Sequence, residues 1–170
     1  MAGFCGSAAS RGRLMAGVNF NPDLVTQAVR RAAMRGIVIG TERIRSEAIN
    51  LILNTQKTGR LYFRSGLSKL SKSGKSFSGG HRASAPGEPP ASDTGNLVRR
   101  IDVQYDRKAL IGYVVSRADY SVFLEYGTQR MAARPFMRPA AANCKDEVEQ
   151  IISWEIKLEL ESIAKSGGLT

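Results

Sequence analysis

Apolar and small residues recur every three or four positions in the first third of the chain, after an Asn21-Pro22 pair that is typical of a helix start. The spacing predicts one long amphipathic helix that ends near Asn54. Gly36 and Gly40 lie inside it, where glycine lowers helix stability, so we expect either close backbone packing or a bend at these positions. The apolar and small positions are Leu24, Ala28, Ala32, Ile37, Gly40, Ile44, Ala48, Leu51 and Ile52.

A different period appears near the middle of the chain. Ile101, Val103 and Tyr105 alternate with polar residues, and Asp106-Arg107 follows as a turn. The alternation then resumes, which predicts an antiparallel β-hairpin with one buried face. The apolar set of the returning strand is Ala109, Ile111, Tyr113 and Val115.

The last part of the chain returns to helical spacing. Residues 120–126 fit either a short helix or a third strand, and Pro139 opens a final helix. Helix, long loop, hairpin and helix together predict an α+β fold with the C-terminal helix packed on the small sheet. The apolar stripe of this helix is Ala141, Cys144, Val148, Ile151, Ile152, Ile156, Leu160 and Ile163. Its acidic face carries Asp146, Glu147, Glu149, Glu155, Glu159 and Glu161.

Segments without periodicity divide the chain into a domain and its extensions. We expect a flexible arm over residues 1–20, one domain over 21–165 and a flexible tail over 166–170. Within the domain, residues 55–96 form a long irregular loop whose proline-rich part excludes helix and central strand. Loops of this length are usually functional or disordered.

Charge is the unusual feature of the composition. The 25 Lys and Arg residues against 15 Asp and Glu residues give a net charge of +10, which indicates a polyanion in the working environment. Tyr62 and Phe63 alternate with Lys and Arg residues in the long loop. The loop therefore either binds single-stranded nucleic acid through charge and base stacking or is simply solvated. The basic candidates are Lys57, Arg60, Arg64, Lys69, Lys72, Lys75 and Arg82.

Patterns that carry catalysis or metal binding are missing from the sequence. His81 is the one histidine, and no CxxC, HExxH or GxxxxGK[ST] motif occurs. We therefore expect no catalytic residues, no metal site and no cofactor. Cys5 and Cys144 are interpreted as free thiols of a reducing compartment, and no apolar run reaches the length of a membrane span.

Two ordered stretches, HRASAPGEPPASDTGNLVRRI and DYSVFLEYGTQRMAARPFMRPAA, together resemble a tail-component family of lambdoid long-tailed bacteriophages. The resemblance extends over residues 22–163, with a strand pair between the two stretches and a helix after the second. The motif residues are Pro86, Gly87, Glu88, Pro89, Pro90, Asp93, Thr94, Gly95, Glu125, Tyr126, Gly127, Thr128, Arg134, Pro135 and Phe136.

The resemblance implies a non-catalytic protein of the virion neck or tail, assembled in the host cytoplasm. Its subunits are expected to form a ring of six or twelve copies between the head-completion or connector ring and the tail tube or terminator proteins. Neck protein and tail terminator both remain open, as does sequence-independent contact with DNA in the channel. No membrane partner is implied. The alternative function is a small basic cytosolic nucleic-acid-binding protein.

Within this picture, several residues receive specific roles. The proline-rich stretch is expected to be a stiff extended connector, and Glu125 to pair with Arg134 of the same or the next subunit. Phe136 is expected in the core. The acidic face of the last helix is expected to meet basic surfaces of adjacent subunits.

Overall fold

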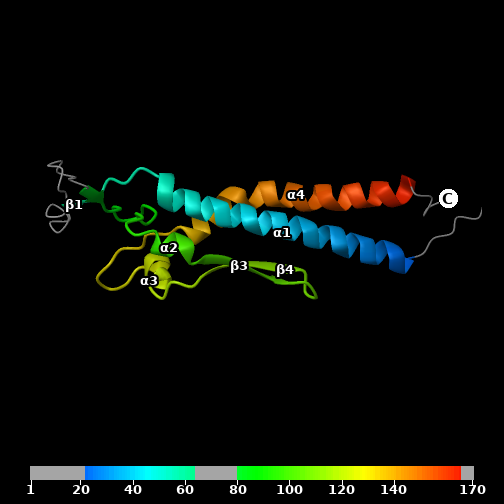
Figure 1. The fold of residues 1–170 in the computed structure, drawn as a ribbon, viewed down its shortest axis with the longest axis horizontal. Helices are drawn as coiled ribbons and strands as arrows, with labels where there is room; N and C mark the ends of the chain where they lie inside the picture. The colour runs from blue at the N-terminus through cyan, green and yellow to red at the C-terminus, as the bar shows by residue number, and fades with distance from the viewer. Residues whose placement is uncertain (1–21, 64–79, 166–170) are drawn as a thin grey trace, which may run out of the picture.

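The computed structural model describes residues 22–63 and 80–165, and it confirms the α+β fold. The expectations for residues 1–20 and 166–170 lie outside the described residues. Figure 1 shows two long helices along most of the molecule, with the smaller elements gathered beside and beyond them. The elements in chain order are α1 (Pro22–Asn54), β1 (Leu61–Phe63), β2 (Gly80–Arg82), α2 (Asn96–Arg99), β3 (Ile101–Asp106), β4 (Ile111–Ser116), α3 (Ser121–Tyr126) and α4 (Met137–Lys165).

The two long helices run antiparallel and pack along each other (Figure 1). Helix α1 is continuous through both glycines, and a Cβ atom on Gly36 would lie 2.7 Å from the Cα atom of Ile152 in α4. A Cβ atom on Gly40 would likewise lie 2.7 Å from a methyl carbon of Val148. These contacts favour close packing over a bend as the reason for glycine. Helix α4 begins two residues before Pro139, so the expected start was late; proline is accommodated in the first turn because its missing N–H is not needed there.

Strands β3 and β4 pair as an antiparallel hairpin, as the alternation predicted. Val103 pairs with Val114 and Tyr105 with Gly112, so these residues share the face that packs on α1. Gly112 is required there, because a Cβ atom would overlap the side chain of Thr41. The expected buried face of β4 was wrong: with an even number of residues in the turn, the odd-numbered residues of β3 lie opposite even-numbered residues of β4, and the odd-numbered β4 residues lie on the other face. The residues expected inside lie on the outer face or in the turn, namely Ala109, Ile111, Tyr113 and Val115.

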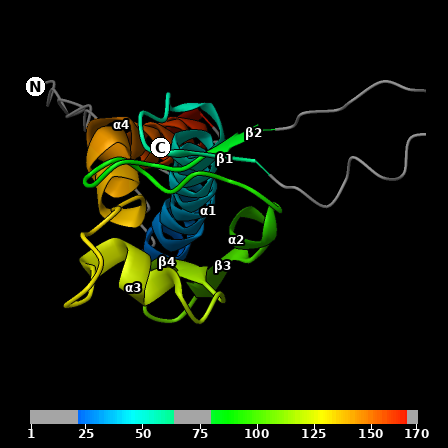
Figure 2. The same ribbon diagram turned by 90° about the vertical axis from the view of Figure 1, so that its left-hand side faces the viewer.

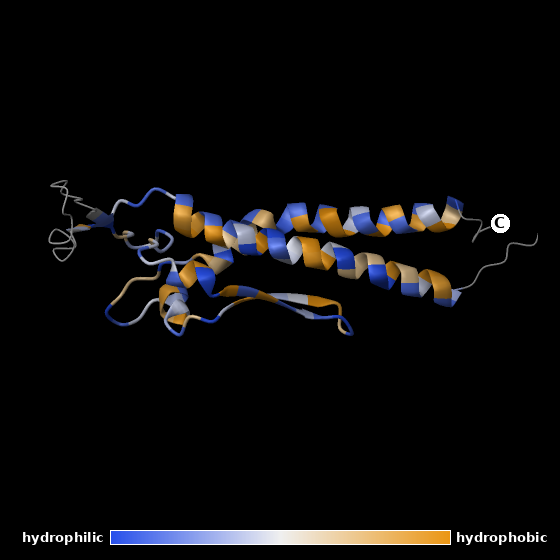
Figure 3. Cartoon of the chain, in the orientation of Figure 1, coloured by the Kyte–Doolittle hydropathy of each residue, from blue (hydrophilic) through white to orange (hydrophobic). Residues whose placement is uncertain are grey.

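Helix α1 lies between α4 and the hairpin, as Figures 1 and 2 show from two directions. Figure 3 shows hydrophobic and hydrophilic residues alternating along both long helices, in agreement with the predicted amphipathic pattern. Residues 121–126 form helix α3, which decides against a third strand. Phe136 is 0% exposed, which confirms its core role. The buried cluster consists of Ala48, Ile52, Leu97, Ile101, Ala118, Phe136 and Ala140.

The first turns of α4 also lie close to the hairpin. Met137 and Val114 of β4 both pack against the buried cluster, and Ala141 lines a small cavity with Val114. This contact brings the start of the last helix onto the sheet, while the rest of α4 follows α1.

Candidate interaction site

The two motif stretches, far apart in the sequence, meet at one end of the molecule. The backbone N–H of Gly87 donates to the carbonyl of Ala133 at 2.9 Å, and Arg134 Nε donates to the carbonyl of Ser84 at 3.3 Å. Gly87 has φ 82°, a conformation that favours glycine. The backbone therefore joins the proline-rich stretch directly to the loop before α4.

Glu125 forms the anchor of the second stretch. Its buried carboxylate accepts backbone N–H groups of Phe136, Met137 and Arg138 at 2.9, 3.0 and 2.9 Å, and Arg138 Nε at 3.3 Å. The expected pair with Arg134 is thus wrong within the chain. Burial raises the pKa of the carboxyl, but the N–H donors outweigh burial and the net pKa is lowered. An anion at this position satisfies the free N–H groups at the start of α4.

The chain between Glu125 and Arg134 closes as a tight loop. Gly127 has φ 78°, and a Cβ atom there would lie 2.8 Å from the carbonyl oxygen of Met131. Thr128 pairs with Met131 in an isolated bridge, and Arg134 N–H donates to the carbonyl of Leu124 at 2.6 Å. Glycine is needed at this turn because both its backbone angle and the close neighbours exclude a side chain.

Glu88 performs a similar role in the proline-rich stretch. Its carboxylate accepts the N–H of Thr58 at 3.0 Å, the hydroxyl of Thr58 at 2.5 Å and the N–H of Ala85 at 2.8 Å. These donors lower the pKa of Glu88 to about 2. Pro90 is buried. The stretch expected to be an extended connector is instead a folded loop held on its own chain, because a carboxylate inside it captures the segment after α1.

Asp93, Thr94 and Gly95 line a pocket of about 290 Å³ beside the one-turn helix α2. His81 lies on the wall with its Nδ1 atom 3.9 Å from Asp93, and Arg134 reaches the same pocket. The pocket therefore joins residues of both motif stretches. Its lining of hydroxyl, carboxyl and guanidinium groups suits a small polar group or a polar side chain of a partner.

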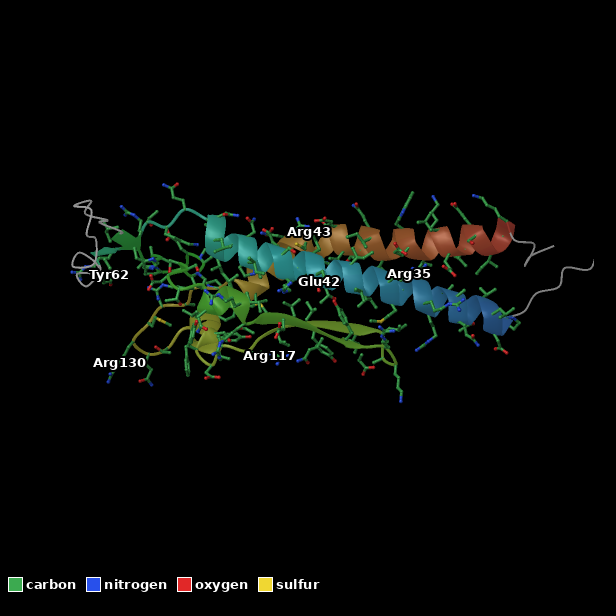
Figure 4. All side chains as sticks on the ribbon, in the orientation of Figure 1. Arg35, Glu42, Arg43, Tyr62, Arg117 and Arg130 are labelled. Carbon is green, nitrogen blue, oxygen red and sulfur yellow. The ribbon has the colours of Figure 1, made fainter. Side chains whose placement is uncertain are left out.

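Three of the seven basic candidates fall within the described residues. Lys57 donates from Nζ to the carbonyl of Leu51 at 3.0 Å, and burial lowers its pKa. The Arg60 guanidinium lies over the ring of Tyr62 at 5.5 Å, and Arg82 donates to a backbone carbonyl at 3.3 Å. Figure 4 shows Tyr62 at the same end of the molecule as the motif loops. The other four candidates, Arg64, Lys69, Lys72 and Lys75, lie outside the described residues.

Helix α3 presents an apolar surface that the sequence analysis missed. Val122, Phe123 and Tyr126 are 59%, 53% and 67% exposed, and the Arg138 guanidinium lies over the Tyr126 ring at 5.1 Å. The signal was available in the spacing i, i+1, i+4, but helical periodicity alone does not say whether a stripe faces the core or solvent. Clustered exposed aromatic residues mark contact surfaces.

The acidic face of α4 is used largely inside the chain. Arg35 of α1 contacts Glu155 at 3.0 Å and Glu159 at 2.7 Å, and Arg43 contacts Glu147 at 3.0 Å. Arg35 and Arg43 are labelled on α1 in Figure 4. We expected this acidic face to meet adjacent subunits. For three of its six acidic residues this expectation is wrong, because they hold α4 against α1 of the same chain.

The remaining chemical features are few within residues 22–63 and 80–165. This part of the chain has no group of three or more His, Cys, Asp or Glu residues arranged for a metal ion, and no helix in it is long and apolar enough to cross a membrane. Cys144 is a buried free thiol, as expected, whereas Cys5 lies outside the described residues. Comparisons of the chain with protein-family models, curated proteins and solved structures find no match.

Proposed function

We propose that this chain is a structural protein of the head–tail connector of a long-tailed bacteriophage. It forms part of a ring that joins the DNA-filled head to the tail, as a tail-completion or terminator-like component. The proposal starts from the ordered set of motifs that the sequence shares with that tail-component family.

One observation carries the proposal furthest: the two motif stretches fold into a single hydrogen-bonded unit. Glu125 holds the start of α4, Glu88 holds the segment after α1, and Gly87 joins the two stretches through Ala133. Because each stretch is held in place by hydrogen bonds to other parts of this unit, the two motifs are expected to occur together. Their carboxylates are occupied by backbone donors, which supports an architectural role.

The exposed surfaces suit a ring subunit. Cyclic assembly requires two different faces on each subunit that are complementary to each other. Two exposed areas offer contact surface: the apolar side chains of α3, and the outer hairpin face with Tyr113 at 47% exposure.

Electron microscopy of particles from a phage that lacks this gene tests the proposal. We expect filled heads beside unattached tails, and restoration of joined particles by the wild-type gene in trans. Overlong tails of irregular length indicate a terminator, and tails of normal length indicate a neck protein. Intact infectious particles without the gene would overturn the proposal.

A second candidate function is binding of single-stranded nucleic acid. It is favoured by the Arg60 guanidinium, which lies over the half-exposed Tyr62 ring at 5.5 Å, and by the basic residues that flank this pair in the sequence. Filter binding at physiological salt separates the two candidates. Submicromolar binding to single strands that falls steeply with salt supports this second function, whereas a neck protein binds weakly at most.

A further inference from the structure

A groove of about 620 Å³ runs between the first half of α1 and the turn of the β3–β4 hairpin. Its apolar lining comes from Met34, Val38 and Ile39 of α1 and from Leu110 of the turn. The Nη2 atom of Arg30 donates to the carbonyl of Lys108 at 2.8 Å, which fixes the turn against the helix. The groove thus has a built wall and an apolar floor, and it lies apart from the motif unit.

Leu110 is held in a conformation that leucine rarely adopts. Its φ is 58°, and it is the one non-glycine residue with positive φ among the described residues. Glycine or asparagine would satisfy this turn position without strain. Strained residues are characteristic of functional positions, and here the strained residue supplies one of the apolar walls of the groove.

The rim of the groove is strongly basic. Four arginines border it, and the carboxylate of Glu155 faces only one of them, Arg35. Arg31 and Arg107 have no hydrogen-bond or ion-pair partner in the part of the chain that the structure describes, and both are exposed. An apolar floor between unpaired guanidinium groups suits a ligand that combines apolar side chains with carboxylates.

The segments of this chain outside the described residues do not have that character. Residues 1–21 and 64–79 contain basic residues and no Asp or Glu, and residues 166–170 have no charged side chain. In a second copy, five of the six acids on the acidic face of α4 already have a basic partner: Glu147, Glu155 and Glu159 pair with Arg43 and Arg35 of α1, and Glu149 and Glu161 lie 4.0 Å from Lys145 and Lys157. The charge of the groove therefore points to a different polypeptide.

We propose that this groove binds an acidic amphipathic helix of another protein. Apolar side chains spaced at i, i+3, i+4 and i+7 enter between Met34, Val38 and Leu110, and flanking carboxylates reach Arg31 and Arg107. Nucleic acid matches the charge of the rim but not the apolar floor. The inference rests on the proposed function only in placing the partner in a neighbouring layer of the virion.

Calorimetric titration of the full chain with a synthetic helical peptide tests the groove directly. The probe is about five turns long, with Leu at i, i+3, i+4 and i+7 and Glu beside them. We expect saturable binding that weakens at least about tenfold in the double variant Arg31→Glu, Arg107→Glu. The matched control is Arg130→Glu. Arg130 is an exposed arginine in the loop before α4, and Figure 4 shows it far from Arg35. This variant should bind the peptide with an affinity within about twofold of the wild type.

Two further measurements separate binding from folding and from charge alone. Leu110→Gly relieves the positive φ, so its thermal midpoint should equal or exceed that of the wild type while peptide binding falls. A peptide with Lys in place of Glu should bind the charge-reversed variant better than it binds the wild type.

Four outcomes would overturn the proposal. These are no peptide binding, equal binding by a peptide with Ser in place of Leu, tighter binding of duplex DNA or phosphatidylserine vesicles through the same arginines, and self-association that the charge reversals abolish. The last outcome would assign the groove to a second copy of this chain. The titration uses purified protein and tests only the groove. The proposed function is tested separately, by electron microscopy of the phage that lacks the gene, so failure of one proposal is distinguishable from failure of the other.

Discussion

Replacing Glu125 by glutamine should expose how much of the fold depends on one buried carboxylate. Glutamine keeps the shape but presents an NH₂ group where one carboxylate oxygen accepts the backbone N–H and Nε of Arg138. The variant also loses the negative charge at the start of α4. Lost hydrogen bonds at about 1 kcal/mol each, with a helix-terminus charge term of the same order, give a destabilisation of about 2–3 kcal/mol.

Urea unfolding at pH 7, followed by circular dichroism and by fluorescence of the single tryptophan, Trp154, measures the effect. With a urea m-value of about 2 kcal/mol/M for a chain of this size, the midpoint should fall by about 1 M or slightly more. Glu149→Gln is the matched control: this carboxylate is 67% exposed and 4.0 Å from Lys145, so we expect less than about 0.5 kcal/mol. A Glu125→Gln midpoint within about 0.2 M of the wild type would refute the capping role.

Acidification gives an independent reading of the same interaction. The pKa of Glu125 is lowered from its ordinary value of 4.5, because the backbone donors outweigh the opposing effect of burial. Its stabilising contribution is therefore complete above pH 4.5 and is lost as the pH falls through the lower folded-state pKa. The difference in unfolding free energy between wild type and Glu125→Gln should narrow over that range.

Three further predictions concern other parts of the chain. Glu88→Gln should speed backbone hydrogen exchange in the proline-rich loop at pH 7. Because the pKa of Glu88 in the folded protein is about 2, the difference in exchange rate between variant and wild type should shrink between pH 4.5 and 2. A difference that does not change with pH would contradict the role of the Glu88 carboxylate in holding the loop. Gly36→Ala should destabilise the protein by about 1–2 kcal/mol despite better helix propensity, because the new methyl group meets the backbone of Ile152; a rise in thermal midpoint would refute the close packing. Val114→Thr should cost about 1 kcal/mol in a urea titration and Tyr113→Thr less than about 0.5, and the reverse order would show that the hairpin faces are exchanged.

Local pattern was sufficient for much of the fold. Helix α1 has the predicted end at Asn54, and the hairpin and last helix lie where period and proline indicated. The face of β4 was not predictable in the same way. Both Val114 and Tyr113 suit a strand, and which of them shares a face with Val103 depends on whether the turn holds an even or an odd number of residues; the four residues between Asp106 and Ile111 place Val114 there.

The motif residues show the same limit: the sequence indicated which positions matter, but not which groups they contact. The motif set chosen from the sequence included Glu88, Glu125 and Gly127. The sequence did not indicate that Glu125 binds the N–H groups of Phe136 to Arg138 instead of Arg134, since backbone donors look alike in every sequence. Sequence charge likewise predicted an acidic α4 face, but not its pairing with Arg35 across the helices.

The sequence by itself determined the kinds of the two long helices and of the hairpin, together with the end of α1, because helix period, strand alternation and proline act over a few neighbouring residues. Tertiary structure decided which apolar residues are buried, which carboxylates receive donors and which arginines stay unpaired. These outcomes depend on contacts between segments distant in the chain, where packing and hydrogen bonding compete for the same side chains. The groove at Leu110 is an example: its strained turn and basic rim exist only because the hairpin folds against α1.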